Sequence, residues 1–154
     1  MPVRIGEYLN WQPDIQADIN QLLFADRICE GRTREVYVYR PNEKWVIKIE
    51  CASTFNNCYE HNIWCAANGT IWAKWFAPVH FIAPLGRALV MTRTRPPRKG
   101  DPPFPKSIPN FFTDVLYRNW GILNGRWVCH DYGDSDLLTI GFKGARLVKS
   151  DIAD

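Results

Sequence analysis

Three polar side chains in the C-terminal half of the sequence have the residue types needed to bind a hard cation and to accept a hydroxyl proton. Asp114 precedes Asn119 by five positions, and Asp131 opens the triplet Asp131-Tyr132-Gly133. Carboxylate and amide oxygens are the ligands that Mg²⁺ prefers, and a carboxylate can also act as a general base. The chain therefore holds the groups for one site, provided that the fold brings them together.

The dipeptide Asn124-Gly125, between two apolar runs, predicts a tight β-hairpin, because a type I′ turn requires positive φ at both central positions. With this turn, Ile122 faces Trp127 and Asn119 faces His130. Asn119 is then expected to lie beside the end of the strand that leads into Asp131. The alternative interpretation is a surface hairpin followed by an ordinary Asp-x-Gly turn.

The elements that must position these residues can be predicted from hydrophobic periodicity and turn signals. Residues 14–25 place Ile15, Ile19, Leu22 and Leu23 on one face of a helix. A second helix is expected over 53–67, with Ser53 as its N-cap and Asn68-Gly69 as its stop. Strands are expected over 35–40, 45–50, 79–83 and 87–93.

Six prolines within residues 94–109 predict an irregular connector, since proline removes a backbone donor and fixes φ. We therefore divide one domain, 1–154, into an N-terminal part (1–93), this connector and a C-terminal part (110–154). Residues 110–120 are compatible with a short helix. Positions five apart in a helix point about 140° apart, so that helix would have to break for Asp114 and Asn119 to share a site.

The composition is that of a globular protein, with 46% apolar and 23% charged residues among 154. A net charge of +3 is too small to indicate a nucleic-acid-binding protein. The N-terminal stretch has no apolar leader, and no run approaches the roughly 18 apolar residues of a membrane span. An odd number of cysteines, five, favours reduced thiols and a cytoplasmic location.

Taken in order, the motifs resemble those of the protein kinase-like superfamily. Asp114-x4-Asn119 has the spacing of the kinase catalytic loop, and Asp131-Tyr132-Gly133 stands where the family has D-F-G. "VIK" at 46–48 matches the end of V-A-I-K. "CEGRTREVYV" at 29–38 aligns with G-x-G-x-x-G-x-V, although Cys29 and Arg34 replace two of the three glycines.

The resemblance implies a site for ATP and Mg²⁺, in which Lys48 holds the phosphates and pairs with Glu60. Asp114 would orient the acceptor hydroxyl, and Asn119 and Asp131 would bind Mg²⁺. Met91 would guard the back of the adenine pocket. The remaining residues expected to contact the nucleotide are Gly31, Arg32, Arg34 and Val36 near the phosphates and the backbones of Thr92 and Thr94 near adenine.

The fold that the resemblance implies is α+β. It is a kinase-like N-terminal lobe, with an antiparallel sheet of about five strands and one main helix, joined to a much reduced C-terminal lobe that carries the hairpin. Phe112-Thr113 replaces the family's His-Arg, and no A-P-E motif follows Gly133. The closest resemblance is to minimal or truncated kinase-like proteins of bacteria and phages.

Two functions follow from the resemblance. The first is phosphotransfer from ATP to a protein hydroxyl. The second is a kinase-like pseudoenzyme that recruits or inhibits a partner protein, for which exposed tryptophans would form the contact surface (Trp11, Trp72, Trp75 and Trp120). A third class, a metal module of Cys58, His61 and Cys65 with Cys51 or Cys29, lacks the C-x-x-C spacing of zinc sites. The sequence leaves the oligomeric state open.

Overall fold

The structure, a computed structural model, describes residues 15–152 and has the predicted α+β class. Its main sheet has five antiparallel strands in the order β1-β2-β3-β5-β4, and two small sheets pair β6 with β9 and β7 with β8. The helices are α1 (Ile15–Leu23), α2 (Asn56–Ala67) and α3 (Leu137–Gly144), with 3₁₀ turns η2 (Ala73–Trp75) and η3 (Tyr117–Asn119). The strands are β1 (Phe24–Glu30), β2 (Arg34–Tyr39), β3 (Trp45–Glu50), β4 (Val79–Ile82), β5 (Ala88–Thr92), β6 (Ser107–Pro109), β7 (Trp120–Leu123), β8 (Arg126–Cys129) and β9 (Leu147–Lys149).

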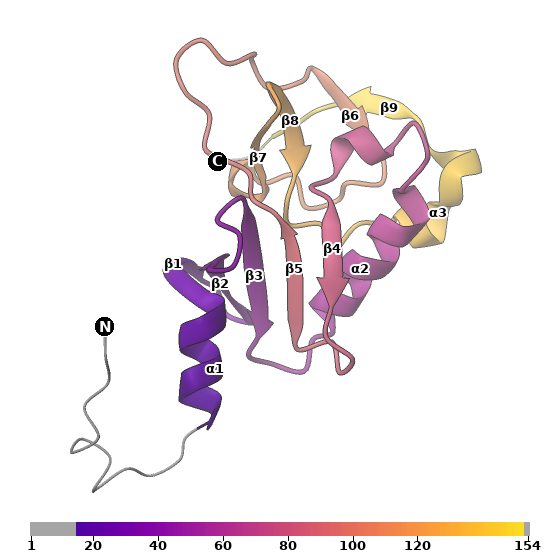
Figure 1. The fold of residues 1–154 in the computed structure, drawn as a ribbon. Helices are drawn as coiled ribbons and strands as arrows, with labels where there is room; N and C mark the ends of the chain where they lie inside the picture. The colour runs from indigo at the N-terminus through magenta and orange to yellow at the C-terminus, as the bar shows by residue number, and fades with distance from the viewer. Residues whose placement is uncertain (1–14, 153–154) are drawn as a thin grey trace, which may run out of the picture.

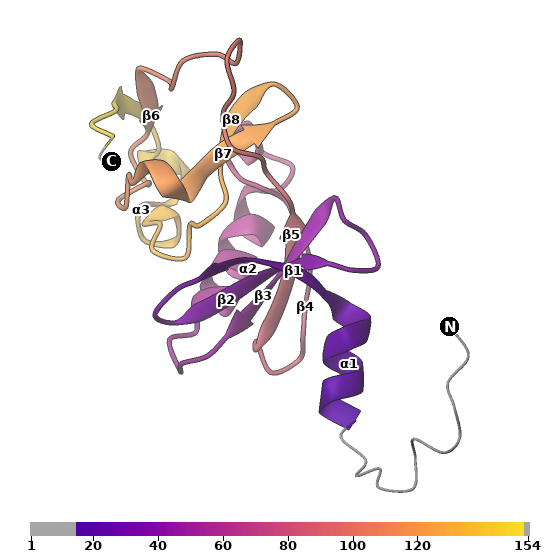
Figure 2. The same cartoon turned by 90° about the vertical axis from the view of Figure 1, so that its left-hand side faces the viewer.

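Helix α2 packs against β3, β4 and β5, whereas α1 extends away from the start of β1 (Figure 1). The C-terminal strands and α3 gather beyond one end of the main sheet (Figure 2). No helix within residues 15–152 combines the length and the apolar character needed to cross a membrane.

Strand β3 lies in the middle of the main sheet and carries Lys48. Lys48 is opposite Val36 of β2 and Leu89 of β5. Residues directly opposite one another share a face of the sheet, so Lys48 is flanked by two apolar side chains and is only 4% exposed. Burial of an ammonium group at this level requires a charged partner.

Helix α2 begins three residues later than the sequence predicts, and Ser53 is not its N-cap. The side chain of Glu50 at the end of β3 takes that role, since it accepts hydrogen bonds from the Asn56 amide (2.9 Å) and the Thr54 hydroxyl (2.5 Å). A carboxylate at a helix N-terminus is also favoured by the helix dipole. The predicted stop is confirmed, because the helix ends at Ala67 and Gly69 has a φ of 83°.

The predicted hairpin is confirmed in its turn and in its register. Asn124 and Gly125 have φ values of 51° and 75°, and Ile122 is opposite Trp127. One step beyond the ladder, the His130 amide donates to the Asn119 carbonyl at 2.8 Å. Asn119 therefore lies beside the residue that precedes Asp131, as the turn requires.

The interpretation of residues 110–120 as a helix is wrong. Leu116 has an extended backbone (φ −92°, ψ 136°), and only the single 3₁₀ turn η3 follows it. The proline-rich connector is irregular as predicted up to residue 106, after which Ser107–Pro109 form β6 and pair with β9.

The core lies where α2, the main sheet and the hairpin meet, and aromatic rings fill much of it. Phe76 stacks on Phe111 and contacts Tyr132 edge-on. Trp120 is 3% exposed, and Trp72 and Trp75 pack against the same core. The predicted contact surface therefore fails for Trp120, which is buried, whereas Trp72 and Trp75 are partly buried against the core. Trp11 lies outside the described residues.

Candidate functional site

Lys48 and Glu60 form a buried ion pair between β3 and α2. The Nζ of Lys48 lies 3.0 Å from each carboxylate oxygen of Glu60, and Glu60 is 0% exposed. The kinase-like resemblance implied this pair, and Glu60 lies one helical turn before Ile63, which faces the core at 1% exposure. Two opposite charges buried together must satisfy one another and form further hydrogen bonds to offset the cost of leaving water.

The end of the hairpin docks directly onto this pair. Lys48 donates a third hydrogen bond, of 2.6 Å, to the backbone carbonyl of His130. Glu60 accepts a 3.1 Å bond from the backbone amide of Tyr132, whose hydroxyl donates to the Ala77 carbonyl at 2.8 Å. Asp131 is thereby held between two anchored neighbours.

Asp131 presents a half-exposed carboxylate beside the ion pair. Partial burial raises the pKa of Asp131, but the positive charges of Lys48 and Arg34 outweigh that effect and lower the pKa from 3.8 to about 2. Its side chain keeps 47% of its accessible surface. Asp131 is therefore an anion at neutral pH that is open to solvent and in contact with the Arg34 guanidinium.

Arg34 places a guanidinium in the centre of this cluster. Its side chain is only 9% exposed, and it lies 2.9 Å from a Glu60 oxygen and in hydrogen-bond contact with an Asp131 oxygen. Burial lowers the pKa of Arg34, but the charges of Glu60 and Asp131 outweigh it and raise the pKa above its ordinary value. Arg34 was predicted to contact phosphate; in the structure its partners are the two carboxylates.

Asp114 and Asn119 meet as the five-residue spacing predicts, without a helix between them. The Asn119 amide nitrogen donates to the Asp114 carboxylate at 2.9 Å and to its backbone carbonyl at 3.2 Å. Asp114 is exposed and Asn119 is 4% exposed. Asp114 and Asp131 line one small cavity of about 10 Å³, so the fold brings both acids to the same hollow.

His130 connects the hairpin to the connector and to η3. Its Nε2 lies 2.9 Å from the Arg118 carbonyl, which can only accept, so this nitrogen carries the proton. Nδ1 then accepts from the Thr94 hydroxyl at 2.8 Å. Burial and the charge of Lys48 lower the pKa of His130 from 6.5 to about 4, which leaves the ring neutral at pH 7.

The residues predicted to contact adenine and the outer phosphates are not gathered in one place in the structure. Met91 is fully buried between Val46 and Val79. The Thr92 amide donates to the Pro78 carbonyl at 2.8 Å, so this group is not free to bond adenine. Gly31 and Arg32 are exposed in the β1–β2 turn, and Val36 shares the sheet face of Lys48.

Two groups that the sequence analysis left out, one side chain and one backbone amide, belong to the cluster. Asn57 is 0% exposed, donates to the backbone carbonyls of Lys48, Gly86 and Arg87, and lies 3.4 Å from Arg34. It precedes Glu60 by three positions and therefore shares its helix face, a spacing that could have identified it. The amide of Tyr132 is the other omission, and a backbone group leaves no signal in a sequence.

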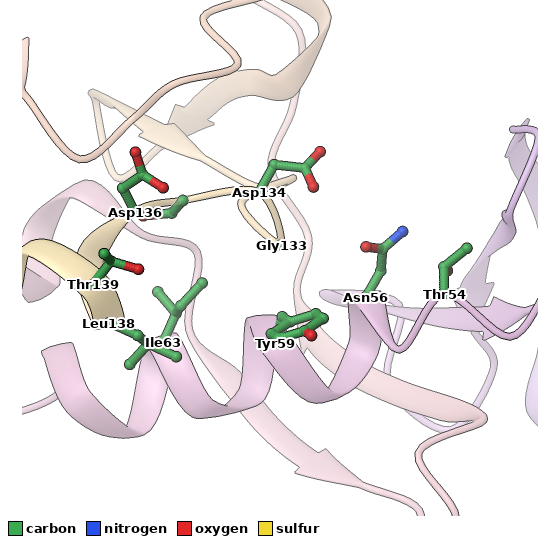
Figure 3. A pocket seen from close by; sticks show the side chains of 10 residues that line it. Thr54, Asn56, Tyr59, Ile63, Gly133, Asp134, Asp136, Leu138 and Thr139 are labelled. Carbon is green, nitrogen blue, oxygen red and sulfur yellow. The ribbon is translucent and has the colours of Figure 1, made fainter.

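A cavity larger than the hollow beside Asp131 lies apart from this cluster, between α2 and the start of α3. It has a volume of about 340 Å³, and none of the predicted site residues lines it. Figure 3 shows Asn56, Tyr59 and Ile63 along α2, with Leu138 and Thr139 across from them. Its position does not support a role in holding a ligand against Lys48.

The cysteine cluster does not form a metal site. Cys65 and His61 approach to 3.6 Å on the exposed side of α2. Within residues 15–152, no group of three or more His, Cys, Asp and Glu side chains has an arrangement that could hold a metal ion. The metal-module interpretation is therefore wrong for the part of the chain that the structure describes.

Comparison with known proteins identifies partial structural similarity. No protein-family model matches the sequence, and no curated protein matches it. Among solved structures, the chain is similar to the streptomycin–ATP–APH(2")-IIa ternary complex, with 14% identity and a TM-score of 0.42. The overlap covers 64% of this chain and spans 31% of that one.

Proposed function

We propose that the chain is a kinase-like phosphotransferase that binds ATP at the Lys48–Glu60 pair and transfers phosphate to a protein hydroxyl. The observation that carries the proposal is the buried Lys48 ammonium, which Glu60 holds at 3.0 Å beside the Asp131 carboxylate. A lysine fixed in this way offers positive charge to phosphate oxygens without reorganising during the reaction. The open end of the cluster, where Asp131 meets solvent, is the side from which a nucleotide would approach.

Asp114 is the proposed acceptor-side group. Its carboxylate is exposed, and Asn119 holds it in place. In the transfer, the bond from the terminal phosphorus to the bridging oxygen breaks, and the electron pair leaves with the nucleoside diphosphate. The acceptor oxygen forms the new bond to phosphorus, and its proton passes to Asp114. Orientation and charge stabilisation supply most of the rate enhancement in such a reaction.

Mg²⁺ at Asn119 and Asp131 remains a prediction from the sequence. The Asp131 oxygen accepts from Arg34, and the amide nitrogen of Asn119 faces Asp114. The Asp131 oxygen that accepts from Arg34 is not open to a hydrated divalent ion, which needs free oxygen ligands in a near-octahedral arrangement. No step is assigned to a metal.

The test is a thermal-shift measurement with ATP, followed by transfer of labelled γ-phosphate to the chain itself or to a lysate. ATP should raise the melting temperature of the wild type, and Lys48→Met should abolish the shift. Lys44→Met is the matched control, because Lys44 is exposed in the turn before β3. A shift that survives Lys48→Met would remove the basis of the proposal.

A second candidate function, the pseudoenzyme that acts through a partner protein, is favoured by one observation. All three protons of the Lys48 ammonium have acceptors within the protein, namely both Glu60 oxygens and the His130 carbonyl. A lysine satisfied in this way stabilises the docked hairpin without a ligand. Absence of any response to ATP, ADP or GTP, with and without Mg²⁺, would favour this function over phosphotransfer.

A further inference from the structure

Arg34 holds an unusual place, since it is a buried cation at the end of a turn otherwise exposed to solvent. The turn is closed by the Gly31 amide, which donates to the Arg34 carbonyl at 2.8 Å, and Arg34 opens β2. Arg34 is opposite Glu50, two positions along from the Val36–Lys48 pair, so it shares the sheet face of Lys48. Its side chain therefore points at α2 and the hairpin.

The guanidinium bridges two carboxylates that come from different elements. Glu60 on α2 receives bonds of 2.9 and 3.1 Å, and Asp131 at the hairpin end receives another from the same Nη2 that contacts Glu60. Asn57 adds a 3.4 Å contact. Two neighbouring carboxylates repel each other unless a cation lies between them, and Arg34 is that cation.

The charges of the cluster are already balanced without a metal ion. Arg34 and Lys48 contribute two positive charges, and Glu60 and Asp131 contribute two negative ones. Arginine keeps its charge under all ordinary conditions, and its planar fork matches carboxylate geometry. A divalent ion that reached the same Asp131 oxygen would have to displace the guanidinium and leave it buried without that partner.

We propose that Arg34 is a tethered cation that takes the position of a divalent metal ion at Asp131, so that the folded chain excludes such ions from this carboxylate. The proposal concerns Asp131 alone and does not depend on phosphotransfer, so its failure and the failure of the proposed function can be told apart.

The test is Mn²⁺-induced line broadening in amide NMR spectra, read at the signals of residues 131–133. The wild type should show no selective broadening there. Arg34→Gln should show it, with Mn²⁺ bound at least about tenfold more tightly, because a unit charge about 4 Å away contributes several kcal/mol at an effective dielectric constant near 20. Arg34→Gln combined with Asp131→Asn should lose the broadening again.

The matched control is Arg32→Gln, which removes an exposed arginine from the same turn and should behave as the wild type. Selective broadening in the wild type overturns the proposal, as does a folded Arg34→Gln protein that remains unbroadened. If Arg34→Gln does not fold, Arg34→Lys carries the test, since a point charge on a shorter stem cannot bridge both carboxylates. In Arg34→Lys, Mn²⁺-induced broadening at residues 131–133 that is greater than in the wild type supports the proposal. Broadening equal to that of the wild type overturns it.

Discussion

The Nζ of Lys48 lies 2.6 Å from the backbone carbonyl oxygen of His130, although 82 positions separate the two residues. This contact joins the central strand of the main sheet to the hairpin end, and it places Asp131 at the ion pair. A residue expected from its motif to hold phosphate thus also fixes the tertiary arrangement. Changes in the cluster should therefore be measured for stability as well as for ligand binding.

Glu60→Gln should lower the free energy of unfolding by about 3–5 kcal/mol, the usual cost of leaving a buried charge without its partner. Glu60 is the shared acceptor of Lys48, Arg34 and the Tyr132 amide. Urea denaturation measures the change. Glu43→Gln is the control, because Glu43 is exposed and its replacement should stay within about 0.5 kcal/mol. Equal losses in the two variants would contradict the assigned role of Glu60.

Gly121→Ala should destabilise the protein by about 1–3 kcal/mol, as overpacking in a core does. A Cβ at this position would lie 2.4 Å from the Thr94 hydroxyl oxygen and 3.1 Å from the Arg95 carbonyl. Thermal and urea unfolding measure the loss. Gly31→Ala should reduce the stability by less, because the nearest neighbour of a Cβ at Gly31 is the Arg34 carbonyl at 3.3 Å. A loss of stability equal to that of Gly121→Ala would argue against the packing explanation.

Gly125→Ala should lower the free energy of unfolding by about 1–2 kcal/mol, because a residue with a Cβ is strained in a left-handed backbone conformation. Gly125 has a φ of 75°, and nothing lies within 4 Å of a Cβ placed there. Asn124→Gly should be close to neutral in a fluorescence-monitored urea titration, because glycine adopts positive φ at no steric cost. If Gly125→Ala were as stable as the wild type, the turn would have another conformation in solution.

The stability should fall as the pH is lowered from 6.5 to about 4, because of His130. Its pKa in the folded chain is about 4, below the ordinary 6.5. In this window the unfolded chain binds a proton that the folded chain does not, so acid favours unfolding. Urea titrations across pH 4–7 should show that the free energy of unfolding of the wild type falls with falling pH, and that it falls less steeply in His130→Gln. His61→Gln should keep the wild-type slope, and a full slope in His130→Gln would exclude His130 as its source.

The parts of the fold that the sequence predicted correctly are set by local signals. The hairpin register follows from the Asn124-Gly125 turn alone, and the end of α2 follows from Asn68-Gly69. Strand β1 was missed because it is an edge strand with five exposed residues in a row and no alternation of apolar and polar side chains. Strands β6 and β9 were missed because each has three residues and pairs with a partner about forty positions away.

The candidate site likewise contains residues that the sequence identified and residues whose place it could not show. Lys48, Glu60 and Asp131 were identified because each falls within a motif or on a helix face. The place of Arg34 could not be predicted, since its contact with Asp131 spans 97 positions and depends on how the hairpin packs against the sheet. The neutral state of His130 was also beyond the sequence, because it depends on burial and on a carbonyl acceptor.

Backbone hydrogen bonds link the hairpin both to the connector and to the N-terminal part. Arg95 and Ile122 exchange hydrogen bonds of 3.1 and 2.8 Å, and Ala77 donates to the Cys129 carbonyl at 2.8 Å. The connector is also closed on itself by the Arg95–Asp101 pair, with two contacts of 2.6 Å. Hinge bending between the two parts would have to break these ladders. We therefore expect the two parts of the chain to unfold in one cooperative transition.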